Sequence, residues 1–222
     1  MFVIGEKAPP LSADLLGKMV VTETATIGHF RHHGFVDPRI ASVLGNVRVA
    51  GSAVTVRIPG ADSTLLHYAL SLCTAGDILV IDRCGDTLHA CWGGVVTCAA
   101  GLANIGGAII DGPATDIAEV VAAGFPLWCR GGSALTTKFL EHESAINIPV
   151  QIGGVAVAPG DAVFADQSGV VIVPRAEAEG VCDTALAMQD SERHVLERLR
   201  RGERLADISG ATARVERSLG RA

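Results

Sequence analysis

Residues 106–116, which read GGAIIDGPATD, contain the pattern that decides the fold. Two glycines precede a short run that is apolar at every position, Ala108–Ile110, and the turn-forming residues 111–114 follow it. Such a run is typical of a strand that is covered on both faces by other layers. Residues 116–123 then have the composition of a helix, which Gly124 ends. The stretch therefore predicts a strand, a loop and a helix in the order that α/β proteins use.

The same organisation extends towards the N-terminus of the chain. Predicted strands at residues 53–58 and 78–81 precede residues with helical apolar spacing at 63–74 and 94–103. Short strands that alternate with helices are typical of βαβ units and a parallel sheet. The centre of the chain therefore predicts successive βα units.

Both ends of the chain differ from this centre. Residues 11–48 are expected to be mainly helical, with a second short helix near residues 38–44. From Ala176 to about Arg201 the apolar residues recur with helical spacing. Between these ends, turn sequences separate short strands that predict a β-meander: 150–152, 155–157, 162–165 and 170–173. We therefore expect an α/β fold with mixed β-sheets, flanking helices and a C-terminal helix.

The composition indicates one globular domain. The chain has 222 residues, of which 49% are hydrophobic and 19% are charged, so it is rich enough in apolar residues for one core and is not intrinsically disordered. We expect a single domain, 1–222, with a core at about 20–175 and a helical arm at 176–222. The low charge content also favours contacts with other subunits.

Several classes of protein are disfavoured by the charge and the cysteine pattern. The net charge of −6 is the opposite of what a nucleic-acid binder needs. Residues 90–110 are uncharged and long enough to span a bilayer, but glycines dilute their hydrophobicity and Asp86 and Asp111 flank them. None of the six cysteines forms a C-x-x-C pair, so we expect buried, reduced thiols and a cytoplasmic protein without a membrane partner.

A glycine turn opens the predicted helix at 94–103. The turn-forming residues and the start of this helix are Trp92, Gly93, Gly94, Val95 and Val96. The backbone N–H groups in the first turn of a helix have no helical acceptor and lie at the positive end of its dipole. This arrangement suits the binding of a carboxylate or a phosphate. The alternative is a close contact between helix and strand that only glycine permits.

Two carboxylates, Asp111 and Asp116, surround the loop that follows the strand at 108–110. Ligands of open α/β sheets bind at the carboxyl ends of strands, and carboxylates there suit a hard divalent cation. The alternative is local: Asp116 followed by Glu119 has the spacing of a helix N-cap with its capping-box partner. The residues alone leave both readings open.

An ordered series of motifs resembles the RraA-like family over roughly residues 20–200. The motifs of this series lie at residues 75–82, 92–94, 106–112, 124–126, 153–161 and 169–174. This family includes divalent-metal-dependent class II aldolases that act on 4-hydroxy-4-methyl-2-oxoglutarate and 4-carboxy-4-hydroxy-2-oxoadipate, and also a protein regulator of ribonuclease E. The resemblance implies a swivelling β/β/α fold.

The resemblance also implies roles for individual residues. In the aldolases of this family the glycine turn, here residues 93–96, binds the pyruvyl carboxylate through backbone N–H groups. Asp116 matches the metal-binding aspartate, which implies a divalent cation, Mg²⁺ or Mn²⁺. A glutamate of a neighbouring subunit can complete the metal site, and Glu192 is the matching candidate. His89 lies near the glycine turn and is a candidate proton carrier.

Two positions depart from the family pattern. Thr115 stands where the aldolases have a substrate-binding arginine, and Gly94 stands where an acidic residue is frequent. Losing a charged donor costs on the order of 3 kcal/mol of transition-state stabilisation, and the Thr115 hydroxyl offers only one neutral hydrogen bond. Arg83, after the predicted strand at 78–81, or Arg130, after a further predicted strand that ends at Cys129, is a candidate replacement. Otherwise the substrate differs or the protein does not catalyse a reaction.

The sequence thus predicts a divalent-metal-dependent lyase of the pyruvate aldolase or oxaloacetate decarboxylase type, with Asp116 and Thr115 as catalytic candidates. Its expected substrate is a 4-hydroxy-2-oxo acid or a related small carboxylic acid. The alternatives are a non-catalytic regulatory or binding protein, and a metal-dependent lyase for a different hydroxy acid. The resemblance further implies a homo-oligomer, either a trimer or a dimer of trimers.

Overall fold

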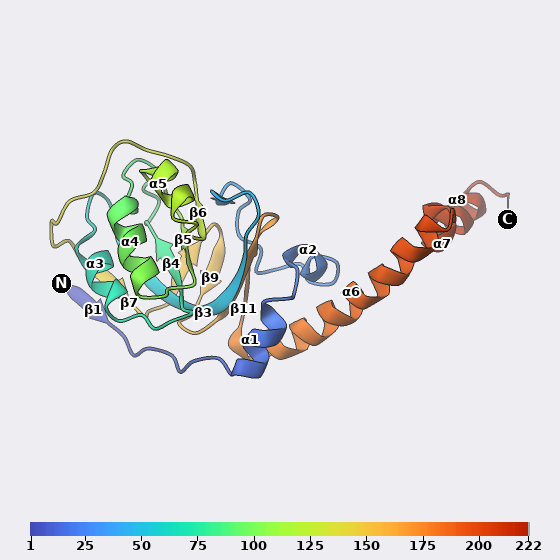
Figure 1. Cartoon of the computed structure of the whole chain (residues 1–222), viewed down its shortest axis with the longest axis horizontal. Helices are drawn as coiled ribbons and strands as arrows, with labels where there is room; N and C mark the ends of the chain where they lie inside the picture. The colour runs from blue at the N-terminus through green and yellow to red at the C-terminus, as the bar shows by residue number, and fades with distance from the viewer. Residues whose placement is uncertain (222) are drawn as a thin grey trace.

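A computed structural model describes residues 1–221 and shows a mixed sheet flanked by helices, from which a long C-terminal helix projects (Figure 1). This arrangement confirms the predicted α/β fold. The principal path through the sheet runs β1 (Phe2–Ile4), β7 (Ser144–Ile146), β3 (Arg48–Arg57), β4 (Ile78–Asp82), β5 (Gly107–Ile110), β6 (Leu127–Cys129) and β2 (Ala41–Ser42).

The strands β3, β4, β5 and β6 are mutually parallel and form the centre of the sheet. The connecting helices α3 (Thr64–Leu70), α4 (Gly94–Leu102) and α5 (Ile117–Ala122) lie together on one face of it (Figure 1). Residues Ile78–Ile81 and all of β5 are buried, as expected for strands that are covered on both faces. The predicted βα units are therefore confirmed, and their carboxyl-end loops lie along one edge.

The long strand β3 joins this parallel centre to part of the predicted meander, whose four strands are present but form two separate hairpins and not one continuous meander. Its first half pairs antiparallel with β10 (Ala162–Asp166), and its second half pairs parallel with β4. A hairpin connects β10 to β11 (Gly169–Val173), and a second hairpin is formed by β8 (Val150–Ile152) and β9 (Val155–Val157). Gly51 lies near the change of partner, where a Cβ would meet the carbonyl oxygen of Gly76.

The N-terminal region is less helical than predicted. Helices α1 (Ala13–Met19) and α2 (Thr24–Ile27) are present, but the prediction of a helix near residues 38–44 is wrong. Strand β2 lies there and pairs with β6 at the edge of the sheet. Ser42 explains part of the difference, since its hydroxyl accepts a hydrogen bond from the backbone N–H of Leu44 at 3.1 Å and so competes with helical bonding.

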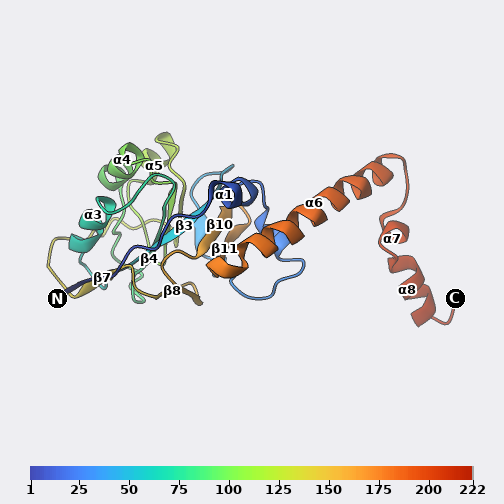
Figure 2. The same cartoon turned by 90° about the horizontal axis from the view of Figure 1, so that it is seen from below.

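The C-terminal segment begins on the body of the protein and then leaves it. A short 3₁₀ turn, η1 (Arg175–Glu177), leads into α6 (Ala178–Arg200), whose buried residues all lie within Ala178–Ala185. The rest of α6 projects away, and α7 (Leu205–Ile208) and α8 (Ala211–Ser218) lie at its far end in both views (Figures 1 and 2). Among residues 1–221, no helix combines the length and apolar character needed to cross a membrane.

Candidate functional site

A cavity of about 340 Å³ lies beside the loops that follow the carboxyl ends of the central strands. Four segments line it: the start of α3 with Ser63 and His67, residues 90–96, Thr115 with Asp116, and residues 136–139. Ligand sites of open α/β sheets occur at this edge. The structure thus brings the predicted glycine turn together with Thr115 and Asp116.

The glycine turn is held rigidly at one wall of the cavity. Gly93 has an extended backbone and its carbonyl accepts the first helical hydrogen bond, from the N–H of Thr97 at 2.9 Å. The Trp92 indole N–H donates to the Thr97 hydroxyl at 2.9 Å, and its ring stacks on Phe125. Because α4 begins at Gly94, the N–H groups of its first turn lie at the cavity.

Asp116 directs its carboxylate to this turn instead of capping its own helix. Its backbone is left-handed, with φ of 50°, and no side-chain capping bond forms, so the capping-box interpretation is wrong. Its Oδ2 accepts a hydrogen bond from the Gly94 N–H at 3.0 Å, and Thr115 Oγ1 donates to its Oδ1 at 3.3 Å. A left-handed aspartate costs on the order of 1 kcal/mol, and such conformations cluster at functional sites.

The close approach of Asp116 and Thr115 to residue 93 requires a glycine at that position. A Cβ at Gly93 would lie 2.6 Å from Asp116 Oδ2 and 2.8 Å from Thr115 Cγ2. Any larger residue would push the carboxylate out of place. The glycine at this position therefore leaves room for Asp116, which is a more specific reason than the helix–strand contact considered from sequence.

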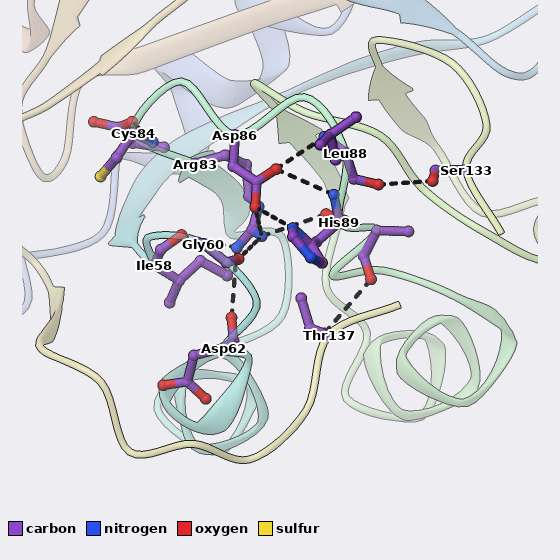
Figure 3. Close-up of polar contacts among 12 residues, drawn as sticks. Ile58, Gly60, Asp62, Arg83, Cys84, Asp86, Leu88, His89, Ser133 and Thr137 are labelled. Carbon is purple, nitrogen blue, oxygen red and sulfur yellow. Dashed lines mark hydrogen bonds and ion pairs between the residues drawn. The ribbon is translucent and has the colours of Figure 1, made fainter. Parts of the chain in front are cut away.

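Arg83 lies outside the cavity lining and is buried between two loops. Its side chain is fully buried, and its guanidinium donates to the carbonyl oxygens of Ile58 at 2.8 Å, of Gly60, and of His89 at 3.3 Å (Figure 3). It also pairs with Asp86 at 3.3 Å. The structure therefore places this candidate as a connection between two loops, and it is not among the described residues that line the cavity.

His89 belongs to the same group of polar contacts. Its Nδ1 lies 2.8 Å from Asp86 Oδ2, and the Asp86 carboxylate also accepts hydrogen bonds from the backbone N–H groups of Leu88 and His89 (Figure 3). These bonds outweigh burial and lower the pKa of Asp86. The cavity lining defined within residues 1–221 includes the adjacent Ala90 but not His89.

The two remaining candidates also lie away from the cavity of this chain. Arg130 pairs with Asp111 at 2.5 Å and with Asp37 at 3.1 Å, beyond the ends of β5 and β6. Glu192 lies on the projecting part of α6, where it lines a separate cavity of about 570 Å³ with Glu23 and Arg193. Among residues 1–221 there is no group of three metal-binding side chains.

The structure adds Lys138 and His67 to the site, which the sequence patterns missed. The segment that contains Lys138 runs beside the start of α3, where the Ser63 N–H donates to the Lys138 carbonyl oxygen at 3.0 Å. His67 meets Phe139 edge to face, and burial lowers its pKa and favours the neutral imidazole. Residues 133–143 form no regular element, so no periodicity indicates their position.

A buried carboxylate, Asp62, holds this segment against the body. It accepts hydrogen bonds from the backbone N–H groups of Leu140 at 3.0 Å and His142 at 2.9 Å, and from Thr64. Burial opposes ionisation, but these bonds outweigh it and lower the pKa of Asp62 to about 2. The charged carboxylate thus fixes the loop that brings Lys138 to the cavity.

Comparison with known proteins shows the same architecture and related sequences. A protein of Halalkalibacterium halodurans, named as a candidate 4-hydroxy-4-methyl-2-oxoglutarate aldolase, is 34% identical over 65% of this chain and 68% of its own length. An uncharacterized Pseudomonas syringae structure has a TM-score of 0.79 and 27% identity, over 93% of this chain and 98% of that one.

A third similar protein belongs by its description to a family of ribonuclease inhibitors, and regulation of a ribonuclease is the other kind of activity in the family that the sequence resembles. Streptomyces coelicolor RraAS2, described as an unusual member of the RNase ES inhibitor RraA family, has a TM-score of 0.75 and 25% identity, over 85% of this chain and 98% of its own. The family model described as RraA-like, Aldolase/RraA, matches residues 19–172. The chain therefore belongs to the RraA-like family.

Proposed function

We propose that the protein is a divalent-metal-dependent lyase of the pyruvate aldolase or oxaloacetate decarboxylase type. Its substrate would be a 4-hydroxy-2-oxo acid or a related small carboxylic acid. The observation that carries this proposal is the Asp116 carboxylate, which is held on the Gly94 N–H inside a cavity that also has the first turn of α4 and Lys138. The name of the Halalkalibacterium relative supports the same reaction class.

The residues present fit a divalent cation such as Mg²⁺ or Mn²⁺. Asp116 is exposed to the cavity, and the space that its carboxylate occupies is kept free by Gly93, whose Cβ would lie 2.6 Å away. One or two carboxylates are the usual protein contribution to a Mg²⁺ site. When bound at Asp116, the cation would polarise the 2-oxo group and stabilise negative charge on the enolate oxygen.

The other residues of the cavity have roles in binding the substrate. The N–H groups in the first turn of α4, at Val95 and Val96, are suited to one carboxylate of a 2-oxo acid. Lys138 provides a positive charge for a carboxylate or carbonyl oxygen of the substrate. Thr115 donates at most one neutral hydrogen bond, so Lys138 takes over the electrostatic part of the role expected of Arg83 or Arg130.

A second candidate function, a regulatory or binding protein without catalysis, is favoured by Thr115. A neutral residue beside Asp116 removes one charged donor from the cavity. A protein that only binds a partner through this fold needs no cation at Asp116. Calorimetry with Mg²⁺ or Mn²⁺ separates the two functions, because the enzyme predicts metal binding that the Asp116→Ala variant loses, and the regulator predicts none.

We infer that the protein assembles as a homo-oligomer, a trimer or a dimer of trimers, as the resemblance implies. Apolar side chains are exposed around the cavity, with Val95 at 80% and Phe139 at 66% of full exposure. The far end of α6, with α7 and α8, lies away from the body (Figures 1 and 2). A second copy would cover such surfaces and would bring its own α6, with Glu192, to a neighbour. Light scattering tests the assembly, since a monomer at micromolar concentration contradicts it.

The direct test of the proposed function is pyruvate release. Purified protein is incubated with 4-hydroxy-4-methyl-2-oxoglutarate or oxaloacetate, with and without Mg²⁺ or Mn²⁺. Metal-dependent pyruvate release is expected from at least one of them. Folded protein that binds the cation but releases no pyruvate from either substrate would contradict this reaction class.

A further inference from the structure

The space beside Gly94 is filled by a second carboxylate. A Cβ built on Gly94 would lie 1.8 Å from Glu119 Oε2 and 3.0 Å from Glu119 Cδ. Real atoms cannot approach so closely, so the Glu119 carboxylate occupies the position into which a side chain at residue 94 would project. The same glycine donates its N–H to Asp116. The carboxylates of Asp116 and Glu119, from the start of α5, therefore both lie beside Gly94 at the start of α4.

The local structure of α5 explains why Glu119 points there. Asp116 immediately precedes α5 and Glu119 lies in its first turn. Both carboxylates lie at the glycine turn, because a Cβ at Gly93 would be 2.6 Å from Asp116 Oδ2 and a Cβ at Gly94 would be 1.8 Å from Glu119 Oε2. In a capping box the Glu119 carboxylate would turn back to the N–H of Asp116. The left-handed backbone of Asp116 prevents this box, and both side chains instead extend to the glycine turn.

The charges around Gly94 are unbalanced. Among residues 1–221, neither Asp116 nor Glu119 forms an ion pair with a Lys, Arg or His side chain. Two like charges at one position repel each other, and a shared cation removes that cost. Lys138 lines the cavity with Asp116, whereas Glu119 lies behind Gly94 and is not among the described residues of that lining, so one lysine faces two neighbouring carboxylates.

We propose that Glu119 is a positioning residue for the divalent cation at Asp116. This inference rests on the metal-dependent function proposed above. Mg²⁺ and Mn²⁺ retain water molecules when they bind to few protein ligands. The Glu119 carboxylate accepts hydrogen bonds from the hydration shell and adds its negative charge, while Asp116 binds the cation directly. Gly94 is glycine because this carboxylate takes the place of its side chain.

Binding of Mn²⁺ to the full-length protein, measured by calorimetry and by the electron paramagnetic resonance signal of free Mn²⁺, tests this role without substrate. Glu119→Gln keeps the shape of the side chain and removes its charge, and the Mn²⁺ affinity should fall about 10- to 100-fold. Glu216→Gln, on the exposed helix α8, is the matched control and should bind Mn²⁺ as the wild type does.

A relocated carboxylate tests whether the charge itself matters. In Gly94→Asp combined with Glu119→Ala, the new carboxylate projects into the space that Glu119 leaves, and Mn²⁺ affinity should return to within about fivefold of the wild type. The single variant Gly94→Ala displaces the Glu119 carboxylate without removing it, and should weaken binding. If the double variant does not recover the Mn²⁺ affinity that Glu119→Gln loses, a carboxylate at this position is not what strengthens binding, and the proposal is wrong.

The Asp116→Asn variant separates this inference from the proposed function. If Asp116→Asn abolishes Mn²⁺ binding and Glu119→Gln binds like the wild type, Glu119 has no role and only this inference fails. If Asp116→Asn itself binds Mn²⁺ like the wild type, the cation is not at this site and the proposed function fails with it.

Discussion

The carboxylate of Asp116 accepts a hydrogen bond at 3.0 Å from the backbone N–H of Gly94, which lies 22 residues earlier in the chain. This bond joins the loop after β5 to the start of α4, at the carboxyl edge of the sheet. It places a carboxylate beside the first turn of a helix, which attracts negative charge. A cation held there would lie next to the N–H groups that suit a substrate carboxylate.

Lys138 is expected to bind the substrate by its charge. Replacing it with methionine removes the ammonium group from the cavity but keeps a chain of similar length. A hydrogen bond to a charged group contributes about 1.5–3 kcal/mol, so KM for the 2-oxo acid should rise roughly 10- to 100-fold. Lys138→Arg should retain most of the affinity. The control is Lys18→Met, since Lys18 pairs with Glu179 and Asp183 and lies outside the cavity lining. Steady-state kinetics that show Lys138→Met equal to this control would remove Lys138 from the site.

Thr115 is the position that should limit the activity. Introducing a guanidinium with Thr115→Arg supplies a second positive charge beside Asp116, and kcat/KM should increase up to about a hundredfold. Thr115→Val, which removes the hydroxyl at nearly constant volume, should lower it modestly. If Thr115→Arg has no effect on pyruvate release while Mn²⁺ binding is unchanged, Lys138 already supplies the charge in full.

Arg83 should matter for stability more than for substrate binding. Its fully buried guanidinium holds carbonyl oxygens of two loops, and Arg83→Met would leave these acceptors without donors. The free energy of unfolding should fall by about 3 kcal/mol, measured by urea denaturation. Arg39→Met, whose side chain is 81% exposed and pairs with Asp37, should cost less than about 1 kcal/mol. A stable Arg83→Met protein with greatly raised KM would restore Arg83 as a substrate-binding residue.

Asp62 should make the loop at 136–142 sensitive to acid. Its pKa is about 2 in the folded protein and 3.8 ordinarily, so its ionised form stabilises the fold above pH 4. This contribution should be lost as the pH falls from about 4 to about 2, because protonation then favours the unfolded state. Unfolding free energies measured across this range should show a weaker pH dependence in Asp62→Asn. An identical dependence in both proteins would contradict the assigned role.

The elements that sequence patterns predicted are those whose signals are local. Strands β4 and β5 are short apolar runs between turn residues, and the strands of the two hairpins, β8–β9 and β10–β11, are separated by clear turn sequences. The three-residue strands β1 and β7 are too short to show a period, and β2 exists only because β6 offers it an edge. Their formation depends on partners distant in the sequence.

The candidate site shows the same division. Motifs indicated Asp116, Thr115 and the glycine turn, and the structure places them in one cavity. Lys138 reaches that cavity on an irregular loop that Asp62 holds, which no local pattern reveals. Glu119 had the spacing of a capping partner, and only the left-handed backbone of Asp116 shows why it turns to Gly94 instead.

The most direct test of the account compares the wild type with Asp116→Asn for Mn²⁺ binding and for Mn²⁺-dependent pyruvate release from 4-hydroxy-4-methyl-2-oxoglutarate and oxaloacetate. The wild type should bind Mn²⁺ and release pyruvate. The folded Asp116→Asn variant should lose the binding and at least about a hundredfold of the rate. A variant that binds Mn²⁺ and releases pyruvate as the wild type does would contradict the central claim that Asp116 holds the catalytic cation.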